Sequence, residues 1–239
     1  MPLPTIVTPT YELELPSTGK KIKYRPFLVK EEKLLVLALE SEDTKQITTA
    51  IRTVLKSCIQ TRGVKVELLP TFDIEFLFLN IRGKSVGEEI EVNLIAPDEE
   101  ETQVPVTINI DDIKIQKDKS HTNKIKLDAK LIMEMKYPSL DEFVKNNFDF
   151  AGEVGMDQSF DLIAYCIDKI YNEEEVWSAA DCTKIEMKDF LEQMNSLQFK
   201  EIETFFTTMP KLSHNVTFTN PKTEVESTVV LEGLSSFFA

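Results

Sequence analysis

The chain has 239 residues, of which 42% are hydrophobic, and a formal net charge of −14 at pH 7. This apolar content excludes wholesale disorder and suits one large domain or two small ones. The negative charge disfavours binding to bare nucleic acid or to an anionic membrane surface. Ten acidic residues and two lysines fall within 138–175. These acids either keep the protein soluble, which is the commoner role, or offer an acidic face to a basic partner.

The first segment predicts a β-hairpin followed by helices. Apolar and charged residues alternate over 11–15 and again over 21–25, and Pro16 to Gly19 supply the turn. A helix is expected from Lys30 to Leu39, and Asp43 or Thr44 is expected to cap the next helix, which would stop near Gly63. The apolar stripe of that second helix consists of Ile47, Ile51, Val54, Leu55 and Cys58.

A third helix is expected over 73–82, capped by Thr71 or Asp73. Its main stripe would contain Ile74, Leu77, Phe78 and Ile81, and its opposite side also carries Phe76 and Leu79. A helix that is apolar on nearly all sides lies either at the centre of a core or in an interface.

The middle of the chain changes to a period of two. Apolar residues alternate over 90–94 and over 104–110, with a charged loop expected from Ala96 to Glu101. Further strands are expected at Ile113 to Ile115 and at Leu131 to Met135, joined by a polar connector. This segment predicts a small antiparallel β unit.

The last segment predicts helices and then a closing hairpin. Ser139 and Glu142 have capping-box spacing. One helical face would carry Phe160, Ile163, Ile167 and Ile170, and another Met187, Leu191 and Met194. Ser196 would cap a helix that stops before Pro210. Strand patterns follow from Val216 and from Val225 to Leu231.

Strands and helices are segregated along the chain, so the predicted fold class is α+β with antiparallel strand pairs. The expected segments are 1–87, a β-hairpin plus a helical part; 88–137, the β unit; and 138–239, a helical part with a terminal hairpin. The alternative is that all three form one integrated domain.

The cysteines Cys58, Cys166 and Cys182 are odd in number and widely spaced, which argues against a disulfide framework. Each lies in or near a helix-like apolar pattern and is expected to pack as a reduced thiol in a reducing compartment. No basic segment followed by an apolar run begins the sequence, so no signal peptide is expected. The longest wholly apolar run, Leu34 to Leu39, is too short to span a bilayer.

The sequence offers little support for catalysis or for cofactor or metal binding. Its two histidines, His121 and His214, are far apart and are expected to be ordinary surface residues. No C-x-x-C, H-E-x-x-H or EF-hand pattern occurs. The acidic run from Asp98 to Glu101 is expected to be a solvated hairpin tip rather than a cation site.

The sequence Arg82-Gly83-Lys84-Ser85 has part of a phosphate-binding loop. The loop requires a glycine where Phe78 stands, and it follows a strand rather than a helix. We therefore expect a helix end here, with Gly83 in a left-handed conformation.

The remaining features concern packing and surface. Phenylalanine is frequent, with 15 residues, and occurs in pairs near the end of the chain. Such residues belong either to the monomer's own core or to surfaces that partner proteins cover. The predicted interface residues are Phe27, Phe76, Phe78, Phe237 and Phe238.

Four stretches of the chain resemble the baseplate hub subunit family of T4-like contractile-tailed phages. They are residues 23–35 (KYRPFLVKEEKLL), 72–87 (FDIEFLFLNIRGKSVG), 135–140 (MKYPSL) and 231–238 (LEGLSSFF). The resemblance is spread in order over nearly the whole chain, and the part around 96–130 is less distinctive. It implies a late virion or assembly component of the tail baseplate, made in the bacterial host cytoplasm. It also implies hub and tail proteins, among them the tape-measure protein, as partners, and it carries over no catalytic residue.

The leading hypothesis is therefore a non-enzymatic structural subunit, present in several copies in a symmetric assembly. The second hypothesis is an assembly chaperone or adaptor that holds a basic partner segment against the acids of 138–175 and is absent from the mature virion. The third is a carboxylate-dependent cell-wall hydrolase, suggested only by analogy with other tail hubs.

Overall fold

The computed structural model describes residues 6–41, 43–140, 156–233 and 236. Two compact units divide the chain. The first contains Met1–Val66, Phe72–Gln116 and Lys211–Ala239, and the second contains Glu67–Thr71 and Lys117–Pro210. These units do not coincide with the three segments expected from the sequence, because strands distant along the chain pair with one another in the first unit.

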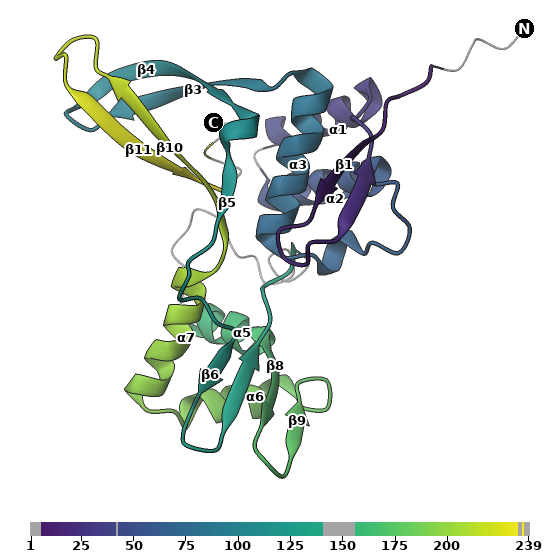
Figure 1. Cartoon of the computed structure of the whole chain (residues 1–239), viewed down its shortest axis with the longest axis vertical. Coiled ribbons are helices and arrows are strands. Elements are labelled where there is room, and N and C mark those ends of the chain that lie inside the picture. Colours follow the sequence, from purple (N-terminus) through teal and green to yellow (C-terminus); the bar gives the residue numbers. More distant parts are fainter. Residues whose placement is uncertain (1–5, 42, 141–155, 234–235, 237–239) are drawn as a thin grey trace, which may run out of the picture. The chain divides into compact units, whose positions relative to one another are not determined.

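The elements of both units are shown in Figure 1. In chain order they are β1 (Tyr11–Glu14), β2 (Lys21–Tyr24), α1 (Val29–Glu40), α2 (Thr44–Cys58), η1 (Val66–Leu68), α3 (Thr71–Val86), β3 (Glu89–Ala96), β4 (Glu99–Asn109), η2 (Ile110–Asp112), β5 (Lys114–Gln116), β6 (Lys124–Lys126), β7 (Ile132–Met135), α5 (Met156–Cys166), β8 (Ile167–Tyr171), β9 (Val176–Ser178), α6 (Lys184–Glu192), α7 (Ser196–Thr208), β10 (Lys211–Thr219) and β11 (Glu226–Glu232). The fold class is α+β, as the sequence predicted.

The first hairpin, β1–β2, is joined to α2 by backbone hydrogen bonds. The amide of Arg25 donates to the carbonyl of Cys58 at 3.0 Å, and the amide of Gln60 donates to the carbonyl of Lys23 at 2.8 Å. α2 begins as expected, because the side chain of Asp43 accepts hydrogen bonds from the amides of Lys45 and Gln46. It ends at Cys58 rather than near Gly63. The chain directly after Cys58 pairs with β2, since Ile59 forms an antiparallel bridge with Tyr24.

Helix α3 is central to the first unit. Its buried residues are Thr71, Phe72, Asp73, Ile74, Leu77, Phe78, Leu79, Ile81 and Gly83, so the pattern that was apolar on nearly all sides belongs to a core helix. The helix continues through Gly83 and ends at Val86, and Gly87 is the residue with positive φ, 121°. The expectation of a left-handed Gly83 is therefore wrong. Gly83 has a packing role instead, because a Cβ there would lie 3.2 Å from Cδ1 of Ile110.

Two sheets of the first unit share one apolar core. The β3–β4 hairpin packs against the sheet with the order β11-β10-β5, and Leu79 of α3 joins the same cluster. Figure 1 shows the two long hairpins running alongside each other. Their turns are also joined, since the amide of Asn220 donates to the carboxylate of Asp98 at 3.1 and 3.2 Å and the hydroxyl of Thr223 donates to it as well. The charged loop expected from Ala96 to Glu101 is thus a tight turn, with β4 already begun at Glu99.

The second unit consists of a sheet, in the order β6-β7-β8-β9, with α5, α6 and α7 packed against it. The sequence predicted a helix continuing through Ile167 and Ile170, but α5 ends at Cys166 and both isoleucines lie in β8. Two further details differ from expectation. Asn195, rather than Ser196, caps α7 through hydrogen bonds to its side chain, and Glu142, the second member of the expected capping box, lies outside the described residues.

Candidate interaction surface

The predicted interface phenylalanines lie mainly in the interior of the first unit. Phe27 and Phe78 are buried, and Phe76 is partly buried against the core that the two sheets share. The amide of Phe27 donates to the hydroxyl of Ser85 on α3 at 2.9 Å, which fixes the backbone at this position. Phe237 and Phe238 lie outside the described residues.

Helix α1 instead buries a charged residue. The carboxylate of Glu31 is 5% exposed and accepts a hydrogen bond from the amide of Leu28 at 2.7 Å, which closes the start of the helix. It also pairs with the guanidinium of Arg25 at 3.0 Å. Burial alone would raise the pKa of Glu31, but the hydrogen bonds from Arg25 and Leu28 and the charges of Arg25 and Lys30 lower it overall.

Most of the circumference of α1 exposes large apolar side chains. Only Glu31 and Ala38 of this helix are buried. The exposed residues, which we call the α1 surface, are Leu28, Val29, Leu34, Val36, Leu37 and Leu39. A helix usually turns its apolar face to the core, so this arrangement is the reverse of the ordinary one. This number of exposed large apolar side chains on a single helix favours a site that another molecule covers.

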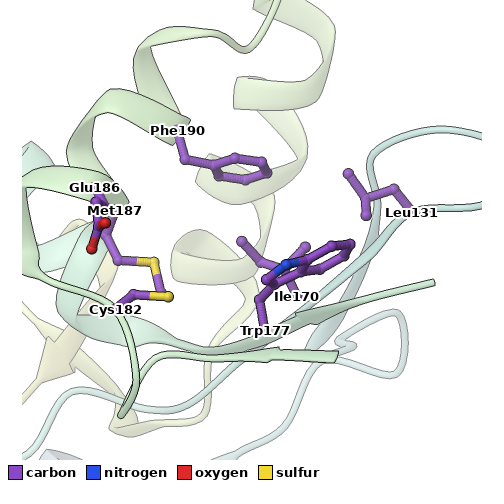
Figure 2. Close-up of a pocket in the computed structure, with 7 residues that line it drawn as sticks. All are labelled: Leu131, Ile170, Trp177, Cys182, Glu186, Met187 and Phe190. Atoms are coloured by element: carbon purple, nitrogen blue, oxygen red, sulfur yellow. The ribbon is translucent and has the colours of Figure 1, made fainter. Parts of the chain in front are cut away.

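A second apolar feature lies in the second unit, between the sheet and α6. It is a pocket of about 270 Å³, which we call the Trp177 pocket, lined by Leu131, Ile170, Trp177, Cys182, Glu186, Met187 and Phe190. Figure 2 shows Phe190 projecting from α6 towards Ile170 and Trp177 across the opening. Ile170 and Trp177 are paired across β8 and β9, so the register places both side chains on one face of the sheet.

Both histidines are partly buried. His121 is partly buried rather than a plain surface residue: its Nδ1 lies 2.9 Å from the hydroxyl of Thr208 and its Nε2 lies 3.0 Å from the hydroxyl of Tyr137. Its ring stacks on Tyr137 and packs against Phe205. These contacts tie the connector before β6 to α7, which is a structural role. His214 lies in β10 and is also partly buried.

Among the residues that the structure describes, no three or more His, Cys, Asp or Glu side chains gather where they could hold a metal ion. The thiols of Cys58 and Cys166 are buried, and burial raises the pKa of Cys58 to about 11, which leaves it unreactive near neutral pH. Within the same described ranges, no helix has the length and apolar character needed to cross a membrane.

The sequence did contain a signal for the α1 surface, although it was not recognised. The run from Leu34 to Leu39 has six consecutive apolar residues, and a helix cannot turn all of them to one side. Some of them therefore had to be exposed or covered by another element. The Trp177 pocket had no comparable signal, because it depends on α6 lying over a particular cross-strand pair.

The α1 surface and the Trp177 pocket are the candidate contact surfaces of the described part of the chain. The chain belongs to a phage family: the model of the family described as T4 bacteriophage base plate protein matches residues 8–239. No curated protein and no solved structure gives a significant match to the chain. The family membership confirms a phage baseplate protein, which places the chain in the virion tail among other tail and baseplate proteins.

Proposed function

We propose that this chain is a non-enzymatic structural subunit of the central hub region of a contractile phage tail, acting through protein–protein contacts. Its partners on this proposal are other hub and tail proteins and the tape-measure protein, and it is present in several copies in a symmetric assembly. The subunit is made late in infection in the bacterial cytoplasm. The match to a baseplate family over residues 8–239 carries the proposal.

The α1 surface supplies the physical basis for such contacts. Covering it would remove the exposed parts of six large apolar side chains from water; full burial of one such side chain is worth roughly 1.5–3 kcal/mol, and each contributes the exposed fraction of that. Permanent assemblies use interfaces that are more hydrophobic than those of transient complexes. The buried pair of Glu31 and Arg25 fixes the rotation of the helix about its axis, since the carboxylate must stay with its donors. The apolar side chains are therefore held outward.

Incorporation into particles tests this role of the α1 surface. A phage lacking its own copy would be complemented with wild-type chain or with Val36→Glu/Leu37→Asp, two substitutions at side chains that are 47% and 54% exposed. We expect the variant to fold normally by circular dichroism but to be missing from sedimented tails. Ile185→Glu is a control, because Ile185 is an exposed apolar residue of the second unit, with 72% of its surface exposed. Equal incorporation of both variants would refute the role of the α1 surface.

Phe237 and Phe238 remain a second proposed contact of the same kind. Phe237→Asp/Phe238→Asp should prevent incorporation while leaving the isolated chain folded, because terminal residues usually contribute little to a domain core. Normal tails from this double variant would remove the two residues from the interface.

The alternative function is an assembly chaperone or adaptor that leaves before the particle is complete. The acidic residues beside the Trp177 pocket favour it, since they suit a basic partner segment. Quantitative mass spectrometry of purified virions separates the two functions. A stoichiometric amount of this chain supports the structural subunit, and its absence from mature tails supports the chaperone.

A further inference from the structure

Strand β9 has a free edge in the described part of the chain. It is the terminal strand of its sheet and pairs only with β8 there. The amide of Asn172 donates to the carbonyl of Glu175 and the amide of Ala179 to the carbonyl of Asp168, so the hydrogen-bonded pairs alternate along this ladder. By that alternation Trp177 bonds to β8, whereas the amide and carbonyl of Val176 point away from the sheet. An unpaired edge of this kind can accept another strand.

The Trp177 pocket opens next to this edge. Trp177 is 40% exposed although it lines the pocket, and Val176 beside it is 65% exposed. Figure 2 shows that the side chains around the opening are mainly apolar, with Glu186 on one side. A volume of about 270 Å³ is below the usual range for a drug-sized ligand and suits one or two apolar side chains.

Acidic residues lie next to β9 in the sequence and at the rim of the pocket. Glu173, Glu174 and Glu175 immediately precede β9 and are exposed. The side chain of Asn172 accepts hydrogen bonds from the amides of Glu174 and Glu175 at 2.8 and 2.7 Å, which orders this turn. Hydrogen bonds from Thr183 lower the pKa of Glu186, so this carboxylate is also charged at neutral pH.

The lysines nearest in sequence have other partners. Lys169 pairs with Glu134 at 3.3 Å, and Lys184 and Lys188 both pair with Asp161. Within the described residues, the three consecutive glutamates have no ion pair. Their repulsion is relieved when a cationic partner approaches.

We propose that the edge of β9 and the Trp177 pocket together bind a basic, extended segment of a partner protein. The segment adds as a short strand beside Val176, inserts an apolar side chain between Trp177 and Phe190, and places Lys or Arg side chains near Glu173, Glu174 and Glu175. Backbone hydrogen bonds supply affinity in this mode, and the pocket and the charges supply selectivity. This binding mode rests on the proposed contact function and specifies the chemistry of one partner, which binds at a surface separate from α1.

The single tryptophan of the chain makes the test direct, because all tryptophan fluorescence comes from Trp177. Purified full-length chain would be titrated with an acetylated eight-residue peptide of alternating Lys and Val. We expect a saturable change in the Trp177 emission that weakens as salt is added. A matched peptide with Glu in place of Lys should bind at least about tenfold more weakly. An unchanged emission, or equal affinity for the two peptides, would overturn the proposal.

Two variants test the parts separately. Val176→Pro removes the amide that points away from β8 and leaves every β8–β9 hydrogen bond in place, so it should weaken peptide binding by about tenfold. Val176→Ala keeps this amide and should not weaken binding. Glu173→Gln/Glu174→Gln/Glu175→Gln should weaken binding and flatten its salt dependence. If the glutamine variant binds as tightly as wild type, the acidic residues have no part in recognition. The titration needs only the purified chain, so its outcome is independent of the incorporation tests of the α1 surface. Either test can fail while the other succeeds.

Discussion

The carboxyl group of Asp73 accepts hydrogen bonds from both the backbone amide of Ser17, at 3.0 Å, and the hydroxyl of Ser17. Asp73 is fully buried in the first turn of α3, and Ser17 lies in the turn between β1 and β2. The sequence offered Asp73 as one of two candidate caps for α3, and in the structure its side chain binds Ser17, which is 56 residues away in the sequence. It therefore joins the first hairpin to the central helix of the unit.

Replacing Asp73 should strongly destabilise the first unit. Asp73→Ala removes the acceptor and leaves the donors of Ser17 without it, so we expect the free energy of unfolding to fall by about 2–3 kcal/mol. Urea denaturation of the purified chain measures this change. Asp112→Asn is a suitable control because Asp112 is exposed, and it should shift stability by less than about 0.5 kcal/mol. A similarly small effect of Asp73→Ala would show that the bond to Ser17 contributes little.

The contact between Gly83 and Ile110 predicts coupling between α3 and the 3-10 turn η2. Alanine would favour the helix by roughly 1 kcal/mol over glycine, but its Cβ would lie 3.2 Å from Cδ1 of Ile110. We therefore expect Gly83→Ala to be more favourable in an Ile110→Val background, which lacks Cδ1, than in wild type. A double-mutant cycle of unfolding free energies measures the difference, and we expect about 1 kcal/mol. Additive effects would mean that Ile110 moves aside freely.

Gly83 and β8 show where sequence patterns reached their limit. The pairing of β8 with β7 shifts its register between Glu134 and Met135 of β7, so Met133 pairs with Ile170 while Met135 pairs with Ile167. This bulge places two isoleucines three residues apart on the same side of a strand. The same spacing is typical of a helix, so periodicity alone could not distinguish the two. Likewise, a glycine before a basic residue indicates a helix end. Only the position of Ile110 against Gly83 shows that this glycine lies within the helix to allow close packing.

The β-hairpins were predicted well for the opposite reason. The alternation is regular over 90–94 in β3 and over 104–108 in β4, and every inward residue of these stretches contributes to one core. Local pattern and tertiary burial agree there, so the sequence was sufficient. On α1, by contrast, the buried side carries Glu31 in an ion pair with Arg25, and which side of the helix is buried by such a pair cannot be inferred from hydrophobic spacing.

The three thiols should differ in reactivity. Cys58 and Cys166 are buried, whereas Cys182 is partly exposed beside the Trp177 pocket. Because only the thiolate reacts, and the pKa of Cys58 is raised to about 11, we expect Cys182 to react first with an aromatic disulfide reagent at pH 8. Cys58 and Cys166 should react only as the chain unfolds. Cys182→Ser should therefore abolish the rapid phase, and a rapid phase that persists would show that another thiol is accessible.

His121 should make the second unit less stable in mild acid. Burial lowers its pKa below the ordinary 6.5, and the nearby charge of Asp118 opposes this shift only partly. Between the folded pKa and 6.5 the unfolded chain therefore binds more protons than the folded chain. The stabilisation is complete above about pH 6.5 and is lost as the pH falls through the folded pKa. We expect the urea midpoint to fall between pH 7.5 and pH 5.5 in wild type and to fall less in His121→Gln, which cannot titrate. An equal fall in the two proteins would assign the pH dependence to other groups.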